Sequence, residues 1–239
     1  SGGIYLGTVS NMMGTTSFMR EDVLMIGLCG VVGVCMPFPL LFRFKFRFTN
    51  RQLLLGAALG IALCNLLCMH VQSIPILCVI SFIAGFLKLC GTFECMSNIQ
   101  LWMAPGRDFS IFFPLLYMIV VGCMNMSSWV ANQLTYHLGS WMMMHWFMIG
   151  LLLIVALTVY VLTRNVRLMP KVPMISVDWL GCVLWSLFLL EGIWIFTYGE
   201  YYNWFDSNVF RTVCVAWPVT LAICIARMRH IRHPFIDQA

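Results

Sequence analysis

Three ionisable side chains stand inside long apolar stretches of this sequence: Lys88, Glu94 and Glu191. A charged group in the middle of a membrane costs about 2.5–3.5 kcal/mol on insertion scales, so such a residue usually faces a cavity or a partner helix. At helical pitch Lys88 shares one stripe with Ser81 and Thr92, whereas Glu94 lies about 120° around the helix. We therefore do not expect Lys88 and Glu94 to pair with each other.

Two interpretations of Lys88 are open. In the functional one, the lysine lines a solvated path and contacts an anionic group on a substrate or on a neighbouring helix. In the structural one, a backbone carbonyl satisfies the ammonium, or the side chain extends its apolar stem until the ammonium reaches water.

A second polar stripe is formed by Asn125, Ser128 and Asn132, which are three and seven residues apart and so share one helix face. Such a stripe either lines a cavity or makes hydrogen bonds between helices, and both readings stay open. The candidate residues of a substrate or ion pathway are Lys88, Glu94, Asn98, Asn125, Ser128 and Asn132.

Signatures of common soluble enzymes are missing from the sequence. It contains no G-x-x-x-x-G-K-[ST] phosphate loop, no H-E-x-x-H and no C-x-x-C. The eleven cysteines are scattered through apolar segments, as expected of small buried hydrophobes. His230 and His233 belong to a basic tail that we interpret as a membrane anchor. We expect no enzymatic activity, no catalytic residue, no cofactor and no metal.

The composition indicates that the chain lies in a membrane. Of 239 residues, 61% are hydrophobic and 10% are charged, against about 25% charged in soluble domains. Lipid must therefore surround most of the chain. The basic residues sit in short groups between apolar runs and do not indicate nucleic acid.

A helix of about 20 mostly apolar residues spans a bilayer. Seven stretches meet this requirement, approximately Asp22–Phe42, Leu53–His70, Pro75–Asn98, Phe109–Asn132, Met142–Thr163, Asp178–Tyr198 and Asn208–Arg227.

The residues before the first full span, Ser1–Phe18, suit the second half of a helix whose start is missing. Counting it, we expect an all-α bundle of about eight transmembrane helices. Eleven of the fourteen Lys and Arg fall in one set of alternate connections, among them the four basic residues Arg43, Lys45, Arg47 and Arg51. Because Lys and Arg collect in cytoplasmic loops, these connections and the end near Ala239 are expected to be cytoplasmic.

Several ordered motifs resemble those of the major facilitator superfamily, in its branch of fourteen-helix drug:proton antiporters. Val177-Asp178-Trp179-Leu180-Gly181 is similar to the D-W-x-G start of that branch's seventh helix, and the stretch from Gly199 to Ser207 resembles its G-x-x-x-x-W-x-[DS] outer loop. His233-Pro234-Phe235-Ile236-Asp237 resembles the H-P-[LF]-[IV]-D segment before its ninth helix. Gly139-Ser140-Trp141 with His145-Trp146-Phe147 is similar to its W-R-W-x-F boundary.

The resemblance covers essentially the whole chain and implies its organisation. Residues 1–164 correspond to an N-terminal six-helix bundle with a truncated first helix, 165–177 to a cytoplasmic linker, 178–227 to two inserted central helices, and 228–239 to a cytoplasmic tail before an absent C-terminal bundle. Glu191 then lies away from the central pathway, which favours a structural role for it.

Three departures from the family pattern concern mechanism. The loop after the second helix keeps the basic residues Arg43, Lys45, Arg47 and Arg51 of the gating motif G-x-x-x-D-R-x-G-R but not its acid. Ser81 stands where the fourth helix usually has an arginine, before Phe82-Ile83-Ala84-Gly85 in place of R-x-x-Q-G. The fifth-helix motif G-P-x-x-G-G is not visible.

The resemblance implies a multi-pass transporter of the inner (plasma) membrane. It would export amphipathic small molecules by alternating access, driven by protons, with the lipid bilayer as its surroundings and outer-envelope export proteins as partners, and without nucleic acid. One alternative is a facilitator or importer on the same fold. The other is a sensor or assembly subunit that does not transport.

Overall fold

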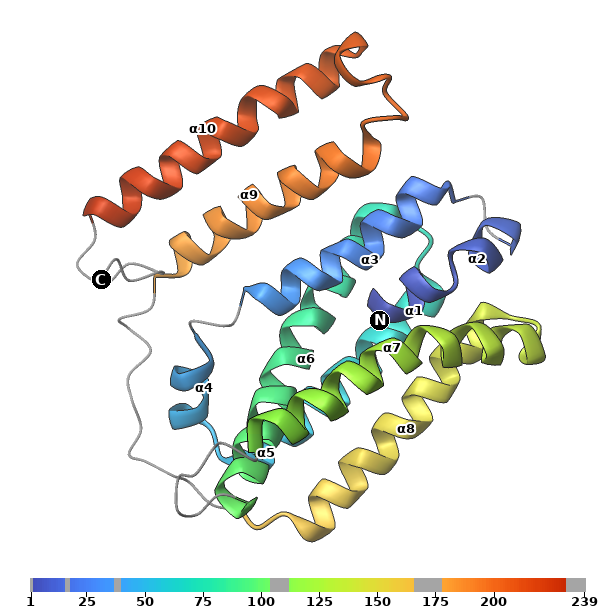
Figure 1. Ribbon diagram of the computed structural model, residues 1–239, viewed down its shortest axis with the longest axis vertical. Helices are drawn as coiled ribbons and strands as arrows, with labels where there is room; N and C mark the ends of the chain where they lie inside the picture. The colour runs from blue at the N-terminus through green and yellow to red at the C-terminus, as the bar shows by residue number, and fades with distance from the viewer. Residues whose placement is uncertain (1, 16–17, 37–39, 104–111, 166–177, 231–239) are drawn as a thin grey trace.

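The computed structural model describes residues 2–15, 18–36, 40–103, 112–165 and 178–230 (Figure 1). Within these ranges the regular structure is helical. Six helices are long and apolar enough to cross a membrane. They are α5 (Asn50–His70), α6 (Ile74–Met103), α7 (Phe112–Leu138), α8 (Trp141–Leu162), α9 (Trp179–Tyr198) and α10 (Asn208–His230). The expectation of a multi-pass helical membrane protein is confirmed.

The first predicted span is wrong in its extent. Its helix, α3 (Arg20–Cys35), has 16 residues and is too short to count among the six spans. A separate helix, α4 (Leu41–Arg47), contains Phe42. The sequence has prolines at 37 and 39, and a proline offers no backbone N–H with which a helix could continue. A long apolar run therefore did not amount to one long helix.

The start of the chain, predicted as the second half of a helix, contains two short helices. Two short helices, α1 (Gly2–Gly7) and α2 (Val9–Thr15), are separated at Thr8. Gly, Ser and Thr are common in this stretch, and these residues favour helix ends over helix interiors. Tyr5 and Met12 anchor the two helices in the main core, together with Val23 and Ile26 of α3.

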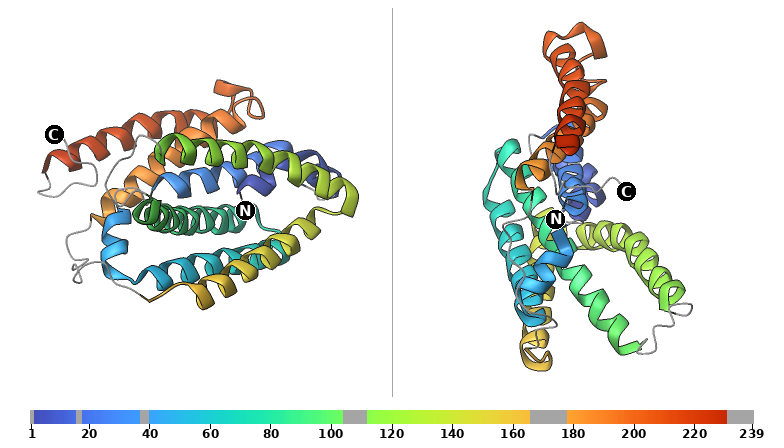
Figure 2. Two further views of the ribbon diagram at one scale, coloured as in Figure 1. Left: turned by 60° about the horizontal axis from the view of Figure 1, so that its bottom comes forward. Right: turned by 90° about the vertical axis from the view of Figure 1, so that its left-hand side faces the viewer.

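Close packing of α3 on α6 forms the centre of the bundle. A Cβ atom added at Gly33 would collide with the backbone carbonyl of Phe82, and one added at Gly85 would collide with the carbonyl of Gly30. Small residues let helix backbones approach this closely in membranes. Helix α5 packs on the other side of α6 and against α8, while α7 contacts α1 and α8. Figure 2 shows α7 and the end of α6 projecting from one side of the remaining helices.

The last two spans form a hairpin, joined through the short 3-10 helix η3 (Trp204–Asp206). Asp178 caps the N-terminus of α9 by accepting a hydrogen bond from the backbone N–H of Gly181 at 2.9 Å, and it forms an ion pair with Arg227 of α10 at 2.8 Å. Helix α9 packs against α3, where the Tyr198 hydroxyl donates a hydrogen bond to the Asp22 carboxylate at 2.6 Å. The hairpin is thereby joined to the rest of the protein.

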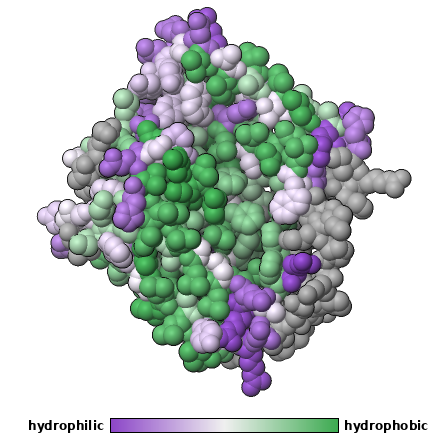
Figure 3. Space-filling view, turned by 180° about the vertical axis from the view of Figure 1, so that it is seen from behind, coloured by the Kyte–Doolittle hydropathy of each residue, from purple (hydrophilic) through white to green (hydrophobic). Residues whose placement is uncertain are grey.

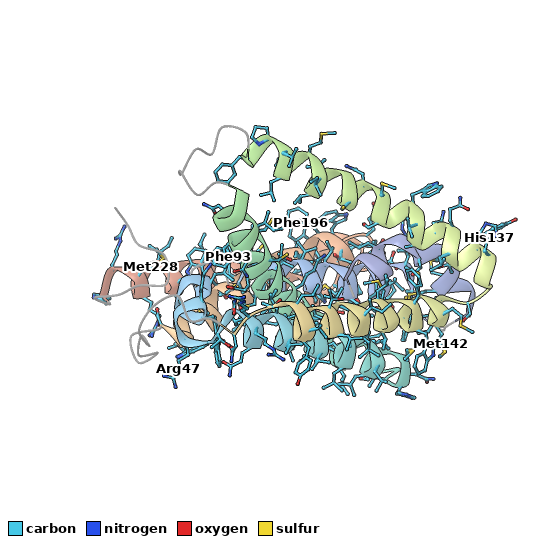
Figure 4. The ribbon with its side chains drawn as sticks, turned by 90° about the horizontal axis from the view of Figure 1, so that it is seen from below. Arg47, Phe93, His137, Met142, Phe196 and Met228 are labelled. Atoms are coloured by element: carbon cyan, nitrogen blue, oxygen red, sulfur yellow. The ribbon has the colours of Figure 1, made fainter. Side chains whose placement is uncertain are left out.

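Charged residues gather at two opposite ends of the helices. Helix α4, the start of α5 and the ends of α8 and α10 lie at one end, which carries Lys45, Arg47, Arg51, Arg164, Arg227 and Arg229. Figure 4 shows Arg47 and Met228 at this end, with His137 and Met142 at the other. Between the ends, hydrophobic side chains cover much of the rear face (Figure 3). This distribution suits a slab of lipid around the middle of the helices.

Candidate functional site: a cavity lined by Lys88

A cavity of about 670 Å³ lies between helices α5, α6 and α8. Its size falls within the range of about 300–1,000 Å³ that is typical of small-molecule sites. Apolar side chains from α5 and α8 form most of two walls, among them Leu54 and Ile61 on one side and Val155 and Val159 on the other. Helix α6 contributes the polar side chains of Lys88, Thr92 and Asn98.

Lys88 stands near the middle of α6, so its charge lies at the depth of the membrane interior. Its side chain is exposed to the cavity and makes no hydrogen bond or ion pair with the part of the chain that the structure describes. Thr92, one turn further along the same stripe, also lines the cavity. The predicted stripe is therefore observed, although Ser81 on the same stripe is fully buried in the core instead.

Glu94 belongs to a different cluster on α6. Its side chain is only 1% exposed and lies 3.9 Å from the ammonium of Lys45, which is 12% exposed. The Asn98 amide donates a hydrogen bond to the Glu94 carboxylate at 3.1 Å, and the Lys45 ammonium also contacts the Ser97 hydroxyl and lies over the Phe93 ring. Glu94 thus meets Lys45 of α4 rather than Lys88, as its place on the helix predicts.

This cluster fixes α4 against the end of α6. Burial lowers the pKa of Lys45, since desolvation disfavours the charged form, and the nearby Glu94 carboxylate partly offsets the effect. Asn98 joins the two regions, because it bonds Glu94 and also lines the cavity.

The other predicted pathway residues lie elsewhere. Asn125 and Asn132 are on the exposed surface of α7, and Asn125 donates its amide hydrogen bond to the carbonyl of Val121 in the same helix at 2.9 Å. Neither residue lines the cavity. The backbone of Ser128 is in α7, but its side chain is outside the described part. The structure therefore groups Lys88 with Asn98 and does not bring the α7 stripe to them.

The four basic residues predicted for the gating loop have separate surroundings. Lys45 is in the Glu94 cluster, and Arg47 is exposed at the end of α4. The Arg51 guanidinium lies 4.1 Å from the centre of the Tyr160 ring and so links α5 to α8 by a cation–π contact. Arg43 is in α4, and its side chain is outside the described part.

One buried polar cluster was missed at the sequence level. The side chains of His145 in α8 and Asn65 in α5 are fully buried and 3.0 Å apart, measured from Nδ1 to Oδ1. Asn65 also donates to the Ile61 carbonyl at 2.8 Å, and the ring of Tyr5 is centred 5.9 Å from that of His145. The available signal was a polar residue in each of two apolar spans, which predicts a hydrogen bond between helices.

No family model matches this chain, and no curated protein is similar enough to count as a relative. The six spanning helices and the cavity between three of them define the class of protein: a multi-pass helical membrane protein. Within the described ranges, no group of three or more His, Cys, Asp or Glu side chains is arranged to hold a metal ion.

Proposed function

We propose that this protein is a secondary transporter of the major facilitator type that exports amphipathic small molecules across the inner (plasma) membrane, driven by protons. Transporters of this type are built from inverted three-helix repeats and work by alternating access. The loop motifs support the proposal, and so does the way in which the helices pair.

The observation that carries the proposal is a repeat in the helix contacts. In an inverted repeat of three helices each, α1 would correspond to α6, α3 to α7 and α5 to α8. Under this correspondence the contact of α3 with α6 is equivalent to the contact of α7 with α1. The contact of α5 with α8 is unchanged. All three of these packed pairs occur in the protein. The packing of α1 on α3 and of α7 on α8 has no such counterpart, because α6 with α7 and α3 with α5 are not among the packed pairs of the described residues. If only these six helices are counted as crossings and the short α2 and α4 are not, three connections separate the members of each corresponding pair, and the two halves then run in opposite directions.

A fourth contact follows the same correspondence. The packing of α5 on α6 is equivalent under it to a contact of α8 with α1, and here the rings of Tyr5 and His145, with centres 5.9 Å apart, are the contact. Although α1 has only six residues, its side chain reaches the helix that the repeat assigns to it. This pairing supports an inverted three-plus-three arrangement.

Lys88 is the candidate pathway residue within this arrangement. An ionisable residue at membrane depth that has no partner in the described part and faces a cavity is typical of substrate and ion pathways. No covalent chemistry is needed for such a role. The cation can hold a substrate in one state of the transporter and release it in the other.

Accumulation of fluorescent dyes in efflux-deficient cells tests the function. The cells express the gene that encodes this chain, and a panel of anionic, neutral and cationic dyes is measured with and without a protonophore. We expect lower accumulation of some dyes, and the protonophore should abolish the difference. Lys88→Met should reduce export at equal expression, while Arg229→Gln, a change in an exposed residue at the end of α10, should not.

The opposite results are equally informative. Dye accumulation that rises with expression would replace export by facilitated uptake, the alternative that the missing antiporter motifs favour. Accumulation that is unchanged for the whole panel would contradict transport and favour a sensor or assembly subunit.

A further inference from the structure

The lining of the cavity also selects the charge of its ligand. We propose that the cavity between α5, α6 and α8 binds anionic amphiphiles, molecules with one negative group and an apolar body, and that Lys88 pairs with the negative group. This inference rests on the proposed function, because it names the class of substrate that the same site accepts.

The charge of the lining is the first argument. Lys88 and Arg164 are its two cations, and none of its described residues is an Asp or Glu. Inside a membrane protein two unit charges interact far more strongly than in water, because the surroundings are less polar. A cationic ligand would therefore be repelled, whereas an anion would gain the partner that Lys88 lacks among the described residues.

Glu94 does not neutralise this charge. It lies six residues after Lys88, about 120° around the helix, and its carboxylate is buried beside Lys45 and Asn98. The carboxylate that the sequence places nearest to Lys88 along α6 is thus committed to another cation. The positive charge of Lys88 remains available to a ligand.

The arrangement of apolar and polar residues gives the shape of the ligand. Lys88 and Asn98 are ten residues apart on α6, so the polar positions extend over about 15 Å of helix. Asn50, Asn98 and Arg164 lie at the basic end of the protein, while Leu54, Ile61 and Val155 line the walls between that end and Lys88. An apolar body fits against these walls, and Arg164 at the basic end of the cavity attracts the same anion.

Binding by the purified protein tests the proposal without requiring transport. The protein is kept in a neutral maltoside detergent and titrated with dansylaminoundecanoic acid, with its methyl ester and with a dansyl-labelled alkylammonium of the same length. We expect the acid to bind about tenfold or more tightly than the ester, since one charge-assisted contact is gained. The alkylammonium should bind most weakly.

Three variants connect this preference to Lys88. Lys88→Gln should lose the preference for the acid over the ester, Lys88→Arg should keep it, and Arg229→Gln should behave as the wild type. If Lys88→Gln does not fold, Arg164→Gln provides the second test, with a smaller loss of affinity for the acid. Equal binding of the three probes, or an unchanged preference in Lys88→Gln, would overturn the proposal.

Competition identifies the source of the anion. Displacement of the probe by decanoate indicates a soluble substrate, and displacement by phosphatidylglycerol alone indicates a lipid headgroup; either result supports the proposed chemistry. The proposed function can fail separately. If the acid binds in a Lys88-dependent way but dye accumulation is unchanged, the binding site is supported and transport is contradicted. If dyes are exported without any charge preference, transport is supported and the anion site is contradicted.

Discussion

Lys88 and Glu94 lie six residues apart on one helix, yet they meet different environments. Lys88 faces a cavity and has no ion-pair partner in the described part of the chain, whereas Glu94 is buried against Lys45. Helical pitch alone separates their directions. Helical pitch could not predict the partner of Glu94, because Lys45 lies on another helix, 49 positions earlier in the sequence.

Replacing Lys45 by methionine tests the value of this ion pair. Lys45→Met leaves the Glu94 carboxylate buried without its cation, and an unsatisfied buried polar group costs about 1–3 kcal/mol, with more for a charge. We expect a loss of that order in the free energy of unfolding, measured with denaturant in detergent. The double variant Lys45→Met with Glu94→Gln should recover most of it, because the buried charge is gone. A double variant as unstable as the single one would contradict the pairing.

At the scale of the helices, α3 and α6 pack closely at glycines on both. Gly33 faces the backbone of Phe82, and Gly85 faces the backbone of Gly30 and Val34. Neither contact leaves room for a Cβ atom, and a backbone cannot move aside as a flexible side chain can. The contact positions α6, and with it the face that carries Lys88.

Substitution of Gly85 by alanine tests this contact. The added methyl group meets the Gly30 carbonyl, and overpacking of this kind costs about 1–3 kcal/mol. We expect a lower melting temperature in detergent and a weaker preference for the anionic probe, as α6 shifts. Gly56→Ala in α5 is the matched control, since a Cβ there has nothing within 4 Å and alanine is the better helix former. Equal effects of the two changes would argue against close packing at Gly85.

Over the whole molecule, the basic residues of α4, Arg164 after α8 and the basic residues of α10 lie at one end, and the acidic residues Glu21, Asp22, Glu200 and Asp206 lie at the other. The positive-inside rule therefore predicts that the end with Arg164 faces the cytoplasm. The Lys88 cavity extends from mid-membrane to that end.

Reporter fusions measure this orientation. Green fluorescent protein fused after Arg164 should fluoresce, because it folds in the cytoplasm, whereas alkaline phosphatase fused after Asp206 should be active on the outer side. Exchanging the two reporters provides the control, and both exchanged fusions should be silent. The reverse pattern would place the Arg164 end of the cavity on the outer side of the membrane, which would contradict entry of the substrate from the cytoplasm.

The sequence by itself determined the membrane setting, six of the seven predicted spans and the separation of charges into two ends. These properties follow from local apolar length, helical pitch and the order of loops along the chain. The length of α3 was overestimated because a hydropathy value does not take account of proline, which has no backbone N–H for a continuing helix, and the sequence has prolines at 37 and 39.

Only the tertiary structure decided which polar residues share a site. Asn125 and Asn132 have a pattern as good as that of Lys88 and Thr92, but α7 contacts α1 and α8 and leaves them on its exposed surface. The partners of Glu94 and His145 likewise come from distant helices. Periodicity gives the direction of a side chain around its own helix, whereas packing among helices settles what lies in that direction.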